Sequence, residues 1–404
     1  MPESDFNAGH DHYSADKLES LSVWGGEPMD SHSSPTQVPV VLSVAFGYAE
    51  VEQWLAVASG NAPGHIYSRN TNPTVAAFEA KVQALEGAEA ATSFASGMAA
   101  ISNTLFALLS PGDRVVSVKD SYGGTSKLFL DTLPRFGIQV TLCETGDHEA
   151  IIRAIRAGCS LAFLETPTNP TLKILDLARL ASVARESGAI TVVDSTLATP
   201  VNQRPLALGA DLVIHSATKF LGGHADALGG VLCGRAKLVG KVFHYREITG
   251  AALEPMSAYL LLRGMKTLHL RIAQQNKSAM AIASWLAGHP AVKAVYYPGL
   301  ANHPDHEIAQ RQMTGFGGVL SFVLNGGFET AQLFLRNLRL VHRAANLGAV
   351  ETIAGSPATT SHVECTTEER AALGIPEGLV RYSVGIEATA DLIADLDCAL
   401  AAVG

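Results

Sequence analysis

The stretch from His215 to Gly230 reads HSATKFLGGHADALGG, and it contains a single lysine, Lys219. The residues that lead into it, LVIH, are apolar and partly β-branched, which is typical of a buried strand. The glycine-rich residues after Lys219 predict a loop. The sequence therefore places a lysine, with Ser216 and Thr218 beside it, where a strand ends and a loop begins.

Short apolar segments of this kind alternate with helical patterns over residues 65–255. One helical pattern, Asp176–Gly188, lies between two of the segments and ends at a glycine, as helices often do. Strands that alternate with helices predict an α/β domain with a mostly parallel sheet covered on both faces. The expected strands are Arg114–Val118, Gln139–Cys143, Leu161–Glu165, Ile190–Asp194, Leu212–His215 and Gly230–Gly234.

The rest of the chain predicts two further parts. Residues 1–64 are rich in Ser, Pro, Gly and His with little periodicity, which predicts an irregular N-terminal arm that is either disordered or wrapped over a partner subunit. Residues 256–404 begin with a long helical pattern, residues 256–289, and predict a smaller α+β domain after the large domain of residues 65–255. Its expected strands lie within residues 291–299, 317–327 and 378–387.

Composition excludes several classes of protein. Hydrophobic residues make up 47% of the 404 residues and charged residues 17%, which argues against a disordered chain or a coiled coil. The net charge is −9 and no cluster of lysine and arginine occurs, so we expect neither a nucleic-acid nor a membrane partner. The five cysteines are scattered without C-x-x-C spacing, which predicts free thiols and no metal site. With no signal-like or membrane-length apolar run, a cytoplasmic protein is expected.

Reactive side chains end three of the predicted strands. Glu165 and Asp194 close their strands, and Lys219 follows the next one. Because the carboxyl ends of parallel strands meet at one edge of a sheet, these groups are expected close together. One interpretation is a buried structural ion pair. The other is a partly buried lysine whose lowered pKa suits it to act as a nucleophile or base.

A second feature is the run Ser96-Gly97-Met98, which precedes a strong helical pattern. A glycine turn that opens a helix presents free backbone N–H groups and can hold a phosphate. Small residues also begin helices for packing reasons alone. A phosphate site, neighbouring hydroxyls, a lysine and a carboxylate are together what pyridoxal phosphate requires.

Several stretches resemble the Cys/Met-metabolism family of pyridoxal-phosphate enzymes. The similarity runs from about residue 36 to the C-terminus, and it implies a fold-type I structure like that of aspartate aminotransferase. The stretches that carry it are YSRNTNPTVAAFE (67–79), ETPTNPTL (165–172), VVDSTLATP (192–200), HSATKFLGGH (215–224), LRGMKTLHLR (262–271) and LVRYSVGIE (379–387).

The resemblance implies roles for the residues at the strand ends. Lys219 would bind the aldehyde of the cofactor and later move protons, and Asp194 would pair with the pyridine nitrogen. Tyr122, in DSYGGT, would stack on the ring and act as an acid or base at the leaving group.

Other residues would hold the phosphate or the substrate. The backbone N–H groups of Gly97 and Met98 and the hydroxyls of Ser216 and Thr218 would bind the phosphate. Asn169 would lie near the ring oxygen and the substrate. The substrate-binding residues implied besides Asn169 are Arg381, for the α-carboxylate, and Thr352.

Tyr67 and Arg69 match positions that reach the phosphate of a neighbouring subunit. Arginine suits this purpose because its planar fork makes two hydrogen bonds to a phosphate. The resemblance therefore implies active sites shared across a dimer, and a homotetramer built from two dimers.

The expected reaction is γ-elimination from a sulfur amino acid, with cystathionine γ-lyase as first choice and methionine as an additional or alternative substrate. A γ-replacement on an O-acyl-homoserine, as in cystathionine γ-synthases, uses the same residues. Three departures bear on the substrate: Thr352 stands where many relatives have serine, Ala225 where asparagine is common, and Gly124 where methionine γ-lyases often carry cysteine. A non-catalytic regulator would need a DNA-binding module with a basic face, and the arm shows neither.

Overall fold

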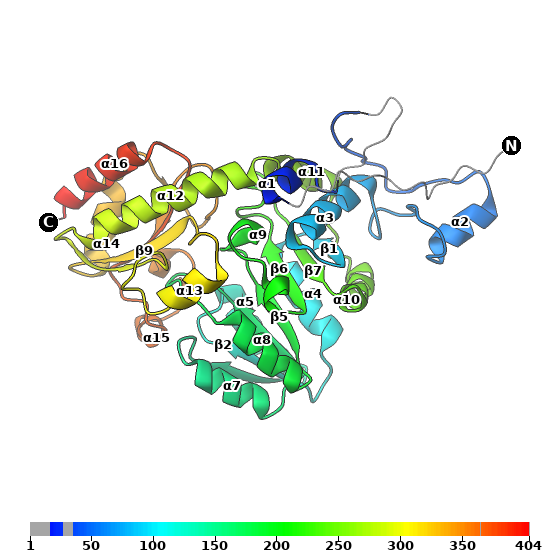
Figure 1. The fold of residues 1–404 in the computed structure, drawn as a ribbon, viewed down its shortest axis with the longest axis horizontal. Coiled ribbons are helices and arrows are strands. Elements are labelled where there is room, and N and C mark those ends of the chain that lie inside the picture. The colour runs from blue at the N-terminus through cyan, green and yellow to red at the C-terminus, as the bar shows by residue number, and fades with distance from the viewer. Residues whose placement is uncertain (1–16, 27–34, 364, 404) are drawn as a thin grey trace.

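The computed structural model describes residues 17–26, 35–363 and 365–403, and it contains two β-sheets (Figure 1). The larger sheet has seven strands in the order β1-β7-β6-β5-β4-β2-β3. Strand β7 is antiparallel to both of its neighbours, and the other pairs are parallel. The strands are β1 Ala90–Phe94, β2 Arg114–Val118, β3 Gln139–Cys143, β4 Leu161–Glu165, β5 Ile190–Asp194, β6 Leu212–Ser216 and β7 Gly230–Gly234.

The helices of this domain lie on both faces of the sheet (Figure 1). Along β4, Leu161 and Phe163 pack into the core beneath α4 and α10, while Ala162 and Leu164 pack into the core beneath α7 and α8. Both faces are thus buried, which is why β4 is an unbroken apolar run. The helices are α3 Pro73–Glu86, α4 Gly97–Leu108, α5 Gly123–Lys127, a π-helical turn Leu128–Thr132, α6 Leu133–Arg135, α7 His148–Arg156, α8 Leu177–Glu186, α9 Thr199–Asn202, a 3₁₀ turn Pro205–Leu208 and α10 Ala236–Thr249.

The second sheet has five strands in the order β10-β11-β12-β9-β8 and belongs to the C-terminal part of the chain. Its apolar face packs against α12 (Leu268–Ala287), α14 and α16 around Phe322, Phe334 and Tyr382. The elements are β8 Val292–Tyr296, α13 His306–Gln312, β9 Val319–Leu324, α14 Phe328–Asn337, β10 His342–Arg343, β11 Ile353–Gly355, a 3₁₀ turn Pro357–Thr359, α15 Thr367–Ala372, β12 Leu379–Ser383 and α16 Thr389–Ala401.

The long helical pattern after Pro255 is two helices, α11 Pro255–Met265 and α12 Leu268–Ala287. The break has a local cause at Gly264. Its carbonyl accepts a hydrogen bond from Arg271 Nη2 at 2.8 Å and a longer one from the Thr267 N–H at 3.3 Å. The buried guanidinium of Arg271 thus binds the last turn of α11 at the point where the two helices separate.

The arm is more regular than its composition predicts, because its described residues include two helices, α1 Leu18–Trp24 and α2 Val51–Ala58. Helix α1 packs on α3, where Lys81 Nζ donates to the Ser22 and Val23 carbonyls at 3.1 and 2.8 Å. Helix α2 has no buried residue and projects from the body (Figure 1). Residues 1–16 and 27–34 of the expected arm lie outside the described part. No helix within residues 17–26, 35–363 or 365–403 is long and apolar enough to span a membrane.

Candidate active site

The three reactive strand ends are adjacent in the structure. Strands β4, β5 and β6 are parallel neighbours, and Glu165 lies directly opposite Asp194 in register. Lys219 occupies the turn after β6, where its backbone N–H donates to the Ser216 carbonyl at 3.1 Å. The strand ends therefore bring two carboxyl groups and an amine to one edge of the sheet.

Lys219 does not pair with Asp194. Its Nζ donates to Asn346 Oδ1 at 2.7 Å, whereas Asp194 Oδ1 accepts from the Thr196 hydroxyl at 2.6 Å and the Thr196 N–H at 3.0 Å. Burial, and then the positive charge of Arg381, lower the pKa of Lys219 to about 8. About one amine in ten is therefore unprotonated at pH 7, far more than for an ordinary lysine, and this neutral form can act as a nucleophile or base. The structural ion pair is the interpretation that these contacts overturn.

Burial raises the pKa of Asp194, while the two hydrogen bonds from Thr196 and the nearby His215 act in the opposite direction. The Thr196 hydroxyl oxygen also accepts the Ser216 N–H at 2.9 Å, which ties the ends of β5 and β6 together. A carboxylate held in this way can pair with a cationic ring nitrogen.

Helix α4 begins at Gly97, as the sequence predicts, and Ser96 caps it by accepting the Ala99 N–H at 3.1 Å. The N–H groups of Gly97 and Met98 precede the first intrahelical hydrogen bond and point out of the helix end. A Cβ atom at position 97 would lie 2.7 Å from Ser216 Cβ, so only glycine allows this close approach. The N-terminal end of α4 and the Ser216 hydroxyl together offer hydrogen-bond donors of the kind that suit a phosphate. The Thr218 hydroxyl lies close by in sequence but bonds to the Gly229 backbone at 3.1 and 3.2 Å.

Tyr122 begins α5, and its side chain is 44% exposed. Its backbone N–H donates to Glu165 Oε2 at 2.7 Å. A Cβ atom at Gly124 would lie 3.0 Å from both the Tyr122 ring and Met98 Sδ, which places this ring beside the beginning of α4. The tyrosine is thus an exposed aromatic group next to the N-terminal end of α4.

Arg381 lies within β12 and is buried. Its Nη1 donates to Asn169 Oδ1 at 3.2 Å and its Nη2 to the Asn346 carbonyl at 2.9 Å. Burial lowers its pKa to about 10, although nearby Tyr122 acts in the opposite direction. Both acceptors are neutral, so the guanidinium charge is not neutralised by these two contacts and could bind a carboxylate.

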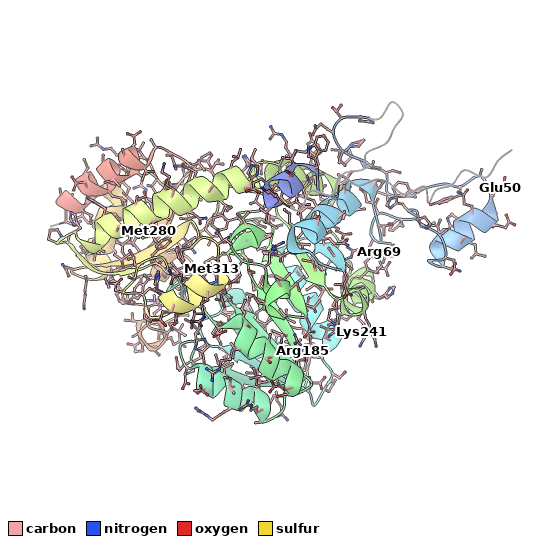
Figure 2. The ribbon with its side chains drawn as sticks, in the orientation of Figure 1. Glu50, Arg69, Arg185, Lys241, Met280 and Met313 are labelled. Carbon is pink, nitrogen blue, oxygen red and sulfur yellow. The ribbon has the colours of Figure 1, made fainter. Side chains whose placement is uncertain are left out.

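Three of the predicted site residues, Thr352, Tyr67 and Arg69, have contacts that do not connect them to Lys219, Asp194 or Arg381. The Thr352 hydroxyl donates to Glu387 Oε2 at 2.8 Å and accepts the Gly385 N–H at 2.9 Å, contacts that brace the small domain. Arg69 lies over the Tyr67 ring, 5.6 Å from its centroid, and donates to the Glu247 carbonyl. Figure 2 shows Arg69 on the side of the molecule that carries α10 and the arm.

Sequence reasoning missed two residues of the site. Thr196 follows Asp194 by two positions, and this spacing is that of an Asx turn, so a signal was present. Asn346 contacts both Lys219 and Arg381 but lies in an irregular segment between β10 and β11. No local pattern marks it.

The model of the family described as "Cys/Met metabolism PLP-dependent enzyme" matches residues 19–401. The chain belongs to this family. Its fold-type I architecture and its pyridoxal phosphate cofactor follow from this membership.

The relatives within the family have different activities. Cystathionine γ-lyase of Bacillus subtilis is 43% identical over 95% of this chain and 99% of its own length. Cystathionine γ-synthase 1 of Arabidopsis thaliana is 41% identical over 95% of this chain and 69% of its own length. L-Methionine γ-lyase of Fusobacterium nucleatum subsp. polymorphum is 43% identical over 89% of this chain and 92% of its own length. The crystal structure of Lactobacillus plantarum cystathionine γ-lyase with L-serine has a TM-score of 0.90 at 39% identity, covering 96% of this chain and 99% of that one.

Proposed function

We propose that this family member catalyses γ-elimination on a sulfur amino acid, with L-cystathionine as first candidate and L-cysteine, 2-oxobutanoate and ammonia as products. The observation that carries the proposal is the contact of Asn346 with both Lys219 and Arg381, at 2.7 and 2.9 Å. A base and a carboxylate-binding arginine held by one residue suit an amino acid whose α-proton must be removed.

The cofactor would be held by residues whose geometry fits it. Pyridoxal phosphate, when bound, supplies an electron sink conjugated to the α-carbon. Lys219 would hold its aldehyde and Asp194 its ring nitrogen. The phosphate would be held by the N–H groups of Gly97 and Met98 and by the hydroxyls of Ser216 and Thr218; Tyr122 and Asn169 would contact the ring.

The remaining steps belong to the chain's own side chains. Arg381 would bind the α-carboxylate, and the Lys219 amine would take the α-proton, for which a pKa of about 8 is suitable. The exposed Tyr122 hydroxyl would exchange a proton with the departing sulfur. We keep Thr352 as a residue that shapes the substrate side, acting through Glu387.

Two other outcomes use the same residues. Methionine elimination is supported by the methionine γ-lyase relative, and γ-replacement on an O-acyl-homoserine by the synthase relative. Elimination and replacement differ in the last step, which water completes in elimination and a thiol completes in replacement.

We also propose that the enzyme is a homotetramer of two dimers in which residues 1–64 of one subunit reach the other, ahead of a cofactor domain (65–255) and a substrate domain (256–404). Helix α2 supports this, because Trp54 and Leu55 are exposed on it. Tyr67 and Arg69 would then complete the partner's phosphate site.

Product analysis tests the proposed reaction. The purified enzyme with pyridoxal phosphate would receive L-cystathionine, L-methionine, or an O-acyl-homoserine with and without L-cysteine. We expect 2-oxobutanoate from cystathionine, at a rate that exceeds the rate from methionine. Cystathionine that accumulates from acyl-homoserine and cysteine, with little oxo acid, would instead establish a synthase. Lys219→Ala serves as the control, since it should remove both turnover and the visible absorbance of the bound cofactor.

A further inference from the structure

Glu165 is a buried acid at the sheet edge to which the proposed reaction gives no role. Its side chain is 3% exposed, and it ends β4 opposite Asp194, whose side chain is 8% exposed. Burying a carboxyl group so close to another is unfavourable unless the two differ in protonation. The position therefore calls for an explanation.

The contacts of Glu165 join two loops. Its Oε2 accepts the Tyr122 N–H at 2.7 Å, and the Asn169 N–H also donates to its carboxyl group. Tyr122 follows β2 and Asn169 follows β4, so one side chain holds the backbones of both residues. These are the two residues expected on the ring of the cofactor.

The charged groups around Glu165 disfavour its ionisation. Burial, Asp194 and then Asp120 raise its pKa well above the usual value, and only the N–H groups of Tyr122 and Asn169 oppose this. Asp120 Oδ2 is 2.9 Å from Lys173 Nζ, so this lysine is already paired with another carboxylate.

Asp194 accepts two hydrogen bonds from Thr196, as Glu165 accepts two from backbone N–H groups, but nearby His215 favours the charged form of Asp194, whereas Asp194 and Asp120 disfavour the charged form of Glu165. When two adjacent carboxyl groups share a buried site, the one whose neighbouring charges favour ionisation keeps the negative charge.

We propose that Glu165 is a positioning residue, a neutral carboxylic acid that holds the backbones of Tyr122 and Asn169 in place and leaves Asp194 as the anion. A protonated carboxyl group keeps acceptor oxygens for both N–H groups. The inference rests on membership of the pyridoxal phosphate family and not on which sulfur amino acid reacts, so it stands or falls separately from the choice of substrate.

Infrared spectroscopy of the holoenzyme tests the protonation state directly. The difference spectrum between the wild type and Glu165→Gln at neutral pH should contain the carbonyl stretch of a protonated carboxylic acid, which the variant lacks. Asp194→Asn is the matched control and should remove a carboxylate band instead. A carboxylate band lost in Glu165→Gln would overturn the proposal.

Circular dichroism of the bound cofactor tests the positioning. Glu165→Ala removes the acceptor and should reduce the visible dichroic band several-fold, because Tyr122 and Asn169 are no longer fixed against the ring. Glu165→Gln keeps an acceptor oxygen and should recover most of the band, although Asp194→Asn should not. Equal loss in Glu165→Gln and Glu165→Ala would show that the charge is needed, and an unchanged band in Glu165→Ala would show that the residue positions nothing. If Glu165→Ala fails to fold, the infrared result still decides the protonation state.

Discussion

At the scale of single residues, Lys219 is a buried amine whose hydrogen-bond partner is the neutral amide of Asn346. Its pKa is lowered from 10.5 to about 8, and a shift of roughly 2.5 pH units corresponds to about 3 kcal/mol. As the pH rises, the folded state loses this proton before the unfolded state does, so the free energy of unfolding rises with pH between about 8 and 10.5. Below pH 8 the amine is protonated in both states, and the full destabilisation caused by the buried charge is present. We expect Lys219→Met to stabilise the cofactor-free protein by about 3 kcal/mol at pH 7, measured by urea unfolding.

The exposed Lys241, labelled in Figure 2, provides the control. Lys241→Met should leave the unfolding midpoint nearly unchanged. The gain in Lys219→Met should also fade as the pH is raised toward 10.5. Equal stability of the two variants across this range would show that the Lys219 amine is not desolvated.

Arg381 makes a second prediction at this scale. Arg381→Lys keeps a positive charge but loses the planar fork that donates to Asn169 and Asn346. We expect kcat/KM to fall roughly 30-fold, which corresponds to about 2 kcal/mol, with KM rising as the carboxylate is held less well. Steady-state kinetics would measure this, with Arg343→Lys on the exposed β10 as control. An unchanged KM would remove Arg381 from the substrate site.

The site residues that can be predicted from the sequence are those that lie next to a recognisable strand or helix. Lys219, Asp194 and Gly97 each follow or precede a recognisable element, so their clustering could be predicted from the topology of a parallel sheet. Asn346 reaches the site from a segment without periodicity, and only the packing of the two domains brings it there. The contacts of Thr352 with Glu387 depend on the register of β11 and β12, which local sequence does not determine.

At the scale of elements, Arg271 connects helix α12 to the turn that carries Lys219. Its Nη1 donates to the Phe220 carbonyl at 2.7 Å, and its Nη2 donates to the carbonyls of Leu221 at 3.2 Å and Gly264 at 2.8 Å. Arg271→Met would leave these buried carbonyls without that donor. We expect a loss of about 3 kcal/mol in the free energy of unfolding, measured with urea.

Arg263→Met, on the exposed face of α11, is the control and should cost far less. Gly223→Ala tests the same contact from the other side. Its φ is +72° and an added Cβ would lie 2.0 Å from Arg271 Nη1. A stable Gly223→Ala protein with unchanged cofactor absorbance would show that the turn tolerates displacement of Arg271.

The elements themselves were largely predictable. Strands β2, β3, β4, β5 and β7 have the predicted bounds, and β6 is longer by Ser216. For β4 the reason is its burial on both faces, which requires an unbroken apolar run. Strand β1, AATSF, was missed because its small residues carry no clear pattern, and its pairing with β7 determines it. The α11–α12 break was missed because it depends on the tertiary contacts of Arg271.

At the scale of the whole molecule, α2 is an amphipathic segment with no residue buried against the described part of its own subunit (Figure 1). If a second copy covers it, Trp54→Glu should weaken the assembly, because a charge would be buried in the contact. Analytical ultracentrifugation should then show a smaller species at low concentration. Leu333→Glu, on exposed α14 in the other domain, is the control. An unchanged mass would mean that α2 takes no part in assembly.

Mixing two inactive variants tests whether a site uses both subunits. Arg69→Ala would damage the partner's phosphate site, whereas Lys219→Ala would damage the subunit's own site. A mixed dimer would contain one site with both defects and one with an intact Lys219 and the partner's intact arginine. Because half of the randomly paired dimers are mixed and half of their sites are native, we expect about a quarter of wild-type activity after dissociation and reassembly. Activity that does not exceed the sum of the separate variants would show that Arg69 acts within its own chain, where it donates to the Glu247 carbonyl.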